Sequence, residues 1–178
     1  DLVLTCTNLI SPILSLQLER SVFRFLIDAR KDEDLQNKII STSLTAVLPS
    51  ILLAIITAPI LALAFHIQYW GYILAIIITS IIANIMLQIP RGLGKNVHYS
   101  IGSAIVGITN ALISIVSVIM LGMGIKGVLL ANIISHILGV IYICVSMRLG
   151  SQIRLSHRSK ATLKKLLKFS IPMIPNDI

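Results

Sequence analysis

Polar and ionisable side chains recur inside the long apolar stretches of this chain, at spacings that place them on helix faces. They are Asn8, Glu19, Arg20 and Arg24 in the first stretch, Asn84, Gln88 and Arg91 in the third, and Asn132 and His136 in the last. An unpartnered polar group in hydrocarbon costs several kcal/mol, so these side chains must face other helices or water. Two interpretations remain open: hydrogen bonds between helices, or the lining of a hydrated cavity. The ionisable His136 is accordingly either a hydrogen-bonded core residue or a proton carrier.

The stretches that carry these residues are typical of membrane spans. Of 178 residues, 56% are hydrophobic and 12% are charged, against about 25% charged in ordinary soluble domains. Five runs meet or approach the roughly 17–25 residues that a membrane helix needs: Leu2–Leu18, Ile39–Phe65, Ile67–Pro90, Tyr99–Ile125 and Gly127–Met147. A sixth begins at Phe169. The sequence therefore predicts an all-α polytopic membrane bundle of five transmembrane helices and the start of another, with the first helix extending to about Leu26.

The basic residues alternate between the connections. Segments 20–38, 91–98 and 148–168 hold five, two and seven Lys or Arg residues, whereas segments 66–71 and 122–127 hold none and one. Basic loops stay on the cytoplasmic side of a membrane. We therefore expect loops 27–38, 91–98 and 148–168 to be cytoplasmic and the N-terminus to be outside. The net charge of +8 then faces anionic membrane lipids, and nucleic acid is not expected as a partner.

This topology also suggests how the chain is organised. An outside start without a signal predicts a preceding helix, and the interrupted sixth span predicts a following one, so we expect a piece of a larger protein. Residues 1–147 form the bundle, 148–168 a basic linker and 169–178 the start of the next span. In the linker, three lysines share one helix face and three leucines another: Lys160, Lys164 and Lys168, and Leu163, Leu166 and Leu167. This pattern predicts an amphipathic helix lying on the membrane surface.

Small residues and prolines indicate how the spans pack and bend. Two spans carry a small residue at every fourth position, which lets helices approach closely in lipid. These residues are Ser103, Gly107 and Ala111, and Gly127, Ala131, Ser135 and Gly139. Pro49 and Pro59 fall inside the second span, where each removes a backbone donor and favours a kink.

The sequence does not predict an enzyme. Of the seven acidic residues, only Glu19 is placed near a membrane cavity, and no paired carboxylates, activated nucleophile or metal-ligand cluster emerges. The two cysteines, Cys6 and Cys144, lie in apolar runs and are expected to pack in the core. We expect no cofactor and no metal.

Three motifs resemble one family of membrane transporters. They are "LQLERSVFRFLID" at residues 16–28, "QIPRGLGKNVHYSIGSAIVG" at 88–107 and "LLKFSIPMIPNDI" at 166–178. Together they resemble bacterial polysaccharide (oligosaccharide-lipid) flippases of the multidrug/oligosaccharidyl-lipid/polysaccharide exporter superfamily. The resemblance implies two pseudo-symmetric lobes around a cavity that opens alternately to each side. This chain would supply helices two to six and the start of the seventh, and the second lobe would be a missing partner.

The resemblance also implies an activity and roles for residues. The cargo would be an undecaprenyl-pyrophosphate-linked oligosaccharide, flipped across the bacterial inner membrane for surface polysaccharide biosynthesis. The residues expected to bind its anionic headgroup or line the cavity are Arg20, Arg24, Arg91, Glu19, Asn8, Asn84 and Gln88. Glu19 and His136 would couple ions, and Pro49 and Pro59 would act as hinges. The alternatives are a drug or cation antiporter of the same superfamily and a membrane enzyme of polysaccharide assembly.

Overall fold

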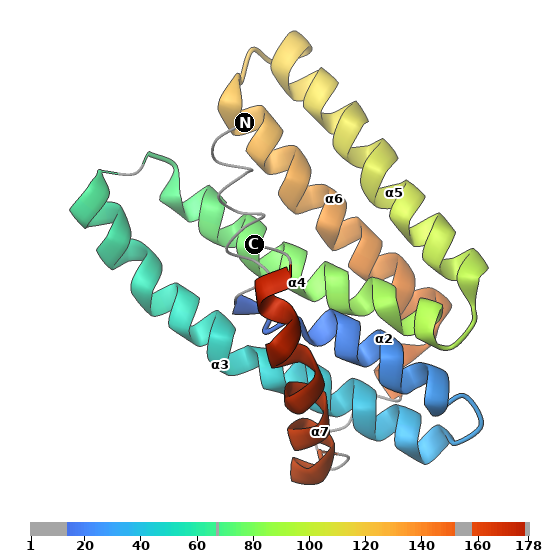
Figure 1. Ribbon diagram of the computed structural model, residues 1–178. Helices are drawn as coiled ribbons and strands as arrows, with labels where there is room; N and C mark the ends of the chain where they lie inside the picture. Colours follow the sequence, from blue (N-terminus) through green and yellow to red (C-terminus); the bar gives the residue numbers. More distant parts are fainter. Residues whose placement is uncertain (1–13, 67, 152–157, 177–178) are drawn as a thin grey trace.

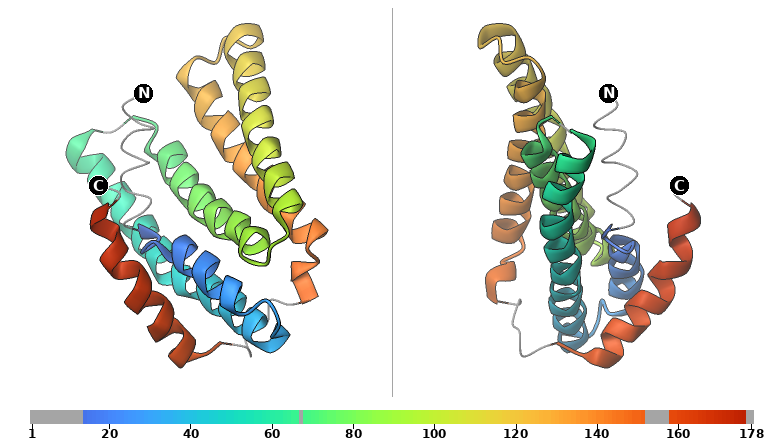
Figure 2. Two further views of the ribbon diagram at one scale, coloured as in Figure 1. Left: turned by 45° about the vertical axis from the view of Figure 1, so that its right-hand side comes forward. Right: turned by 90° about the vertical axis from the view of Figure 1, so that its left-hand side faces the viewer.

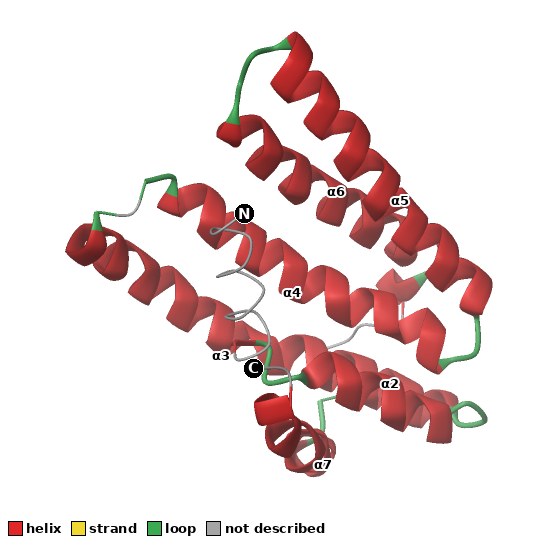
Figure 3. Ribbon diagram, turned by 45° about the horizontal axis from the view of Figure 1, so that its top comes forward, coloured by secondary structure: helices red, strands yellow, loops and turns green. Residues whose placement is uncertain are grey.

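The computed structural model describes residues 14–66, 68–151 and 158–176. This part of the chain is helical and contains no strand (Figures 1 and 3). The α-helices are α2 (Leu18–Asp28), α3 (Glu33–Phe65), α4 (Trp70–Gly92), α5 (Asn96–Ile115), α6 (Ile125–Ser146) and α7 (Lys160–Ser170). A π-helical turn, Val116–Met120, extends α5, and the 3-10 turns Leu149–Ser151 and Ile171–Asn176 follow α6 and α7.

Four segments within the described residues are long and apolar enough to cross a membrane. They are Glu33–Ile60, Trp70–Gly92, Asn96–Met120 and Ile125–Ser146. The four long helices run antiparallel to their sequence neighbours, and α2 and α7 lie on one side of them (Figure 2). The expected all-α membrane bundle is therefore confirmed, with four of the five expected spans. Residues 2–13 of the remaining expected helix, Leu2–Leu26, lie outside the described residues.

The described end of that first span is not one continuous helix, so this expectation was wrong. Leu16 and Gln17 have φ of 52° and 54°, in the left-handed region, and α2 begins only at Leu18. The cause is local: the Ser15 hydroxyl accepts a 3.2 Å hydrogen bond from the Gln17 backbone N–H. Serine side chains compete in this way with helical hydrogen bonding. The break leaves α2 as an eleven-residue helix.

By contrast, α3 is longer than the sequence predicted. It begins at Glu33, within the segment expected to be a loop, because the Asp32 carboxylate caps it by accepting a 3.0 Å bond from Leu35 N–H. Glu33 and Asp34 in its first turn also suit the positive end of the helix dipole. The helix continues through Pro49 and Pro59 to Phe65. Only a short turn therefore separates α2 from α3.

The core of the described bundle surrounds α2. Its residues Leu18, Val22 and Leu26 are fully buried and pack with residues of α3, α4 and α7. The approach to α4 is close, since a Cβ at Gly92 would lie 2.7 Å from the Leu26 Cβ. Larger residues at position 92 would push these helices apart.

The small residues of α6 pack as expected, but those of α5 do not. Gly127, Ala131, Ser135 and Gly139 are all buried. A Cβ at Gly139 would collide with Val106, and one at Gly127 would lie 2.8 Å from the Ser117 side chain. In α5 the buried small residue is Gly102, not the predicted stripe Ser103, Gly107 and Ala111. The space beside Gly107 is open within 4 Å, because this face of α5 points away from its neighbours.

The amphipathic α7 packs on the helical bundle, a contact that the sequence did not predict. Leu166 is fully buried in the core, and Leu167 packs against it. The helix contacts α2 and α3 (Figure 2). Leu166 on its apolar face is thus covered by protein, whereas Leu163 and Leu167 are half-buried and Lys160, Lys164 and Lys168 are exposed.

Replacing Gly127 with leucine should loosen the contact between α5 and α6. The introduced side chain would overlap Ser117, whose backbone carbon lies 3.2 Å from the new Cβ, so we expect a loss of about 1–3 kcal/mol from overpacking. The matched control is Gly107→Leu, which enters open space. Thermal unfolding of the purified protein in detergent measures both. Equal destabilisation by the two variants would contradict the assigned contact face of α5.

Candidate functional site

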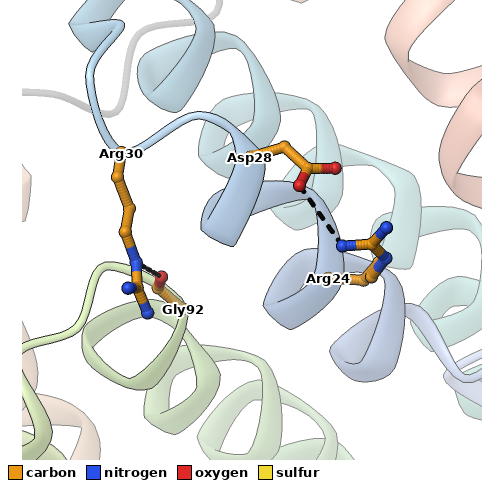
Figure 4. A network of polar contacts seen from close by, with 4 residues as sticks. All are labelled: Arg24, Asp28, Arg30 and Gly92. Atoms are coloured by element: carbon orange, nitrogen blue, oxygen red, sulfur yellow. Dashed lines mark hydrogen bonds and ion pairs between the residues drawn. The ribbon is translucent and has the colours of Figure 1, made fainter.

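The basic connections meet at one end of the bundle. The Arg30 Nε, in the turn between α2 and α3, donates a 2.9 Å hydrogen bond to the carbonyl oxygen of Gly92 at the end of α4 (Figure 4). A pocket of about 420 Å³ lies beside this contact, lined among others by Arg30, Lys31, Lys95 and Met147. Residues from the α2–α3 turn, the α4–α5 turn and the end of α6 therefore converge. We call this region the basic end.

Arg24 lies on α2 just before this turn and forms an ion pair with Asp28. The Arg24 Nη1 is 3.2 Å from the Asp28 Oδ1, and the two side chains are 53% and 58% exposed (Figure 4). The pair has the i, i+4 geometry that the sequence allows on a helix. An exposed pair of this kind contributes about 0–1 kcal/mol. Arg24 can therefore exchange Asp28 for another anion at little cost.

Arg91 is held differently, by aromatic rings from two other helices. Its guanidinium carbon is 4.7 Å from the ring centroid of Phe23 in α2 and 5.4 Å from that of Tyr99 in α5. The Nη1 donates a 3.4 Å hydrogen bond to the Gln88 Oε1. Stacking fixes the plane of a guanidinium while its N–H edges remain able to bind an oxyanion. Arg91 is exposed at the surface of the described chain.

The other predicted residues of this region lie on the same two helices. Asn84 is exposed and Gln88 half-buried, on the face of α4 that leads to Arg91. Glu19 and Arg20 are half-buried at the start of α2, where the Ser15 hydroxyl donates a 3.3 Å hydrogen bond to the Glu19 Oε1. Asn8 lies outside the described residues. The structure thus brings Gln88 and Arg91 into contact and places Glu19 beside the helix break.

The polar residues of α5 and α6 instead connect these two helices. Asn110 donates a 3.4 Å hydrogen bond to the Asn132 Oδ1, and Ser114 donates one of 3.2 Å to the Asn110 Oδ1. This is the interhelical hydrogen bonding that was one of the two open interpretations for Asn132. His136 is half-buried on the same helix. Its Nδ1 is buried, and no residue in the described part of the chain bonds to it.

Some contributors to the site were not predicted from the sequence. Phe23 and Tyr99 support Arg91 from positions 68 and 8 residues away along the chain, and only the fold brings them together. Arg30 was counted among the loop charges but not recognised as a link to α4.

Among the residues that the structure describes, no group of three His, Cys, Asp or Glu side chains is placed to hold a metal ion.

The fold and the basic end together define a polytopic membrane protein with exposed arginines at one end of a helical bundle. Comparison with family models identifies the family. The chain belongs to the family described as "Polysaccharide biosynthesis protein", whose model matches residues 1–178. No curated protein and no solved structure matches the chain.

The stacking of Arg91 on Phe23 can be measured by a double-mutant cycle. We expect Phe23→Leu and Arg91→Gln to be coupled by about 0.5–1 kcal/mol, because each variant alone already removes the cation–π contact. Denaturant unfolding of the two single variants and the double variant gives this energy. Phe23→Leu combined with Lys95→Gln is the control, and its coupling should be close to zero. An equal coupling energy between Phe23 and Lys95 would show that Phe23 interacts only with the general positive charge of the basic end and not specifically with Arg91.

Proposed function

We propose that this chain is part of a membrane transporter that flips an undecaprenyl-pyrophosphate-linked oligosaccharide across the bacterial inner membrane. The family membership supports a role in polysaccharide biosynthesis at a membrane. The observation that carries the finer proposal is the pair of exposed guanidinium groups, Arg24 and Arg91, on neighbouring helices near the basic end. A pyrophosphate is an oxyanion that arginine can bind through two parallel hydrogen bonds.

The two arginines would act in complementary ways. Arg91, stacked between Phe23 and Tyr99, offers a cation of fixed orientation. Arg24 would leave Asp28 and turn to the arriving headgroup, since its present ion pair is exposed and weak. From the positive-inside rule we expect this end on the cytoplasmic side, where the lipid-linked cargo would enter.

The remaining predicted residues would serve the passage of the sugars and the energy coupling. Asn84 and Gln88 extend the polar face of α4 away from Arg91 towards the membrane interior and would hydrogen-bond sugar hydroxyls. Glu19 would pair with an arginine in the empty state or carry a coupling proton. Pro49 and Pro59 would supply hinges for alternating access, together with a second lobe as partner.

The role of Arg24 is tested by replacing it in the full protein in cells. We expect Arg24→Ala to lower surface polysaccharide roughly 10–100-fold, the equivalent of a charged hydrogen bond, while the protein stays in the membrane. Arg24→Lys should retain part of the activity, since lysine keeps the charge but loses bidentate binding. The control is Lys38→Ala, which removes an exposed cation from α3. Unchanged polysaccharide in Arg24→Ala would remove this residue from the site.

Glu19 distinguishes this function from drug or cation antiport. An antiporter for cations requires a carboxylate in its cavity, so Glu19→Gln would abolish drug efflux and leave polysaccharide export intact. For the flippase we expect the opposite: no drug efflux by the parent protein and an effect of Glu19→Gln on polysaccharide alone. Measuring both transport activities in the same strain separates the two.

A further inference from the structure

Helix α7 is fixed to the bundle by hydrogen bonds and ring packing along its length. At its start, the Ser159 backbone N–H donates a 3.2 Å hydrogen bond to the Thr42 hydroxyl of α3. Further along, the buried Ser21 hydroxyl of α2 donates one of 2.8 Å to the carbonyl oxygen of Leu166. Phe169 packs edge-on against Phe25, with ring centroids 5.9 Å apart. The surfaces beside α7 are therefore built by a well-defined contact.

One of these surfaces is a pocket between α7, α3 and the break that precedes α2. Its volume is about 460 Å³, within the roughly 300–1,000 Å³ usual for ligand pockets. The apolar part of its lining comes from all three segments: Leu16, Ala46, Pro49, Leu163 and Leu167. Neither Arg24 nor Arg91 lines it. It is separate from the proposed cargo site.

The charged residues that the structure describes around this pocket are all basic. Arg158 and Lys160 line it and both are exposed, and none of the described residues that line it is acidic. A cation would be repelled, and a wholly polar anion would leave the leucines facing water. A wholly apolar ligand would leave the two cations without an anionic partner. An amphiphile with an anionic head and an apolar chain satisfies both parts of the lining.

The position of the pocket along α3 fits a membrane lipid. The last charged residue of this helix before its apolar stretch is Lys38, and the pocket begins one turn later at Thr42. This change from charged to apolar sequence marks the membrane interface, where lipid phosphates lie. The lining of the pocket therefore suits an anionic lipid, and the pocket lies at the level in the membrane where lipid headgroups are found.

We infer that this pocket binds one anionic phospholipid, with its phosphate on Arg158 and Lys160 and an acyl chain along Leu163 and Leu167. The lipid is a resident of the membrane and not the transported cargo, so the inference does not rest on the proposed function. The bound phospholipid would cover the contact between α3 and α7 and stabilise the packing of α7 on the bundle.

The inference is tested by native mass spectrometry of the full purified protein with phosphatidylglycerol and with phosphatidylcholine of the same acyl chains. We expect the parent protein to retain phosphatidylglycerol preferentially and Arg158→Gln/Lys160→Gln to weaken that binding roughly ten-fold. Lys164→Gln/Lys168→Gln is the matched control: it removes the same charge from the exposed face of α7, outside the pocket. This control should bind as the parent does.

A second variant tests the apolar part without changing any charge. Ala46→Phe would fill the pocket from the α3 side and should also lower phosphatidylglycerol binding. Ala104→Phe, at an exposed position of α5, is its control. Three results would overturn the inference: equal loss in both charge variants, equal retention of the two lipids, or parent-like binding in both Arg158→Gln/Lys160→Gln and Ala46→Phe. The first would mean diffuse attraction by surface charge, the second binding without preference for an anionic headgroup, and the third an unoccupied pocket.

Discussion

The arrangement of the described bundle depends on the burial of one short helix. Leu18, Val22 and Leu26 of α2 are removed from any solvent and join α3, α4 and α7 into one core. Full burial of each such side chain is worth about 1.5–3 kcal/mol in water, and in lipid the same contacts act through close packing. Because α2 is enclosed on these sides, its remaining surface is where Arg24 and Phe23 emerge. The packing that holds the helices together therefore also determines where the side chains of the candidate site lie.

The general architecture was readable from the sequence because it depends on composition and charge. Long runs without charged residues define the spans, and the clustering of lysine and arginine defines which connections share one end. Both are properties of single segments, and Arg30 bonding to Gly92 shows that two of those connections do lie together. Orientation in the membrane is still a prediction from charge.

What the sequence missed depends on contacts between segments. Periodicity showed that α7 has an apolar face but not that α2 and α3 pack against this helix. Spacing marked Gly107 as a packing residue, although Gly102 on another face of α5 makes the contact. The stacking of Arg91 needs Phe23 and Tyr99 from two further helices, and no local pattern encodes that meeting. The break at Leu16 and Gln17 did have a local cause in Ser15, but serine inside an apolar run is usually compatible with a helix.

The attachment of α7 determines where the backbone can bend as it leaves the bundle. Bonds to Thr42 and Ser21 make this helix a rigid extension of α2 and α3 up to Ser170. The chain then enters the 3-10 turn Ile171–Asn176, whose tighter winding has poorer hydrogen bonds and where Pro172 has no N–H to donate. The turn Ile171–Asn176 is therefore the first segment after α7 with weaker backbone hydrogen bonding, and the attached α7 sets the direction from which this turn starts.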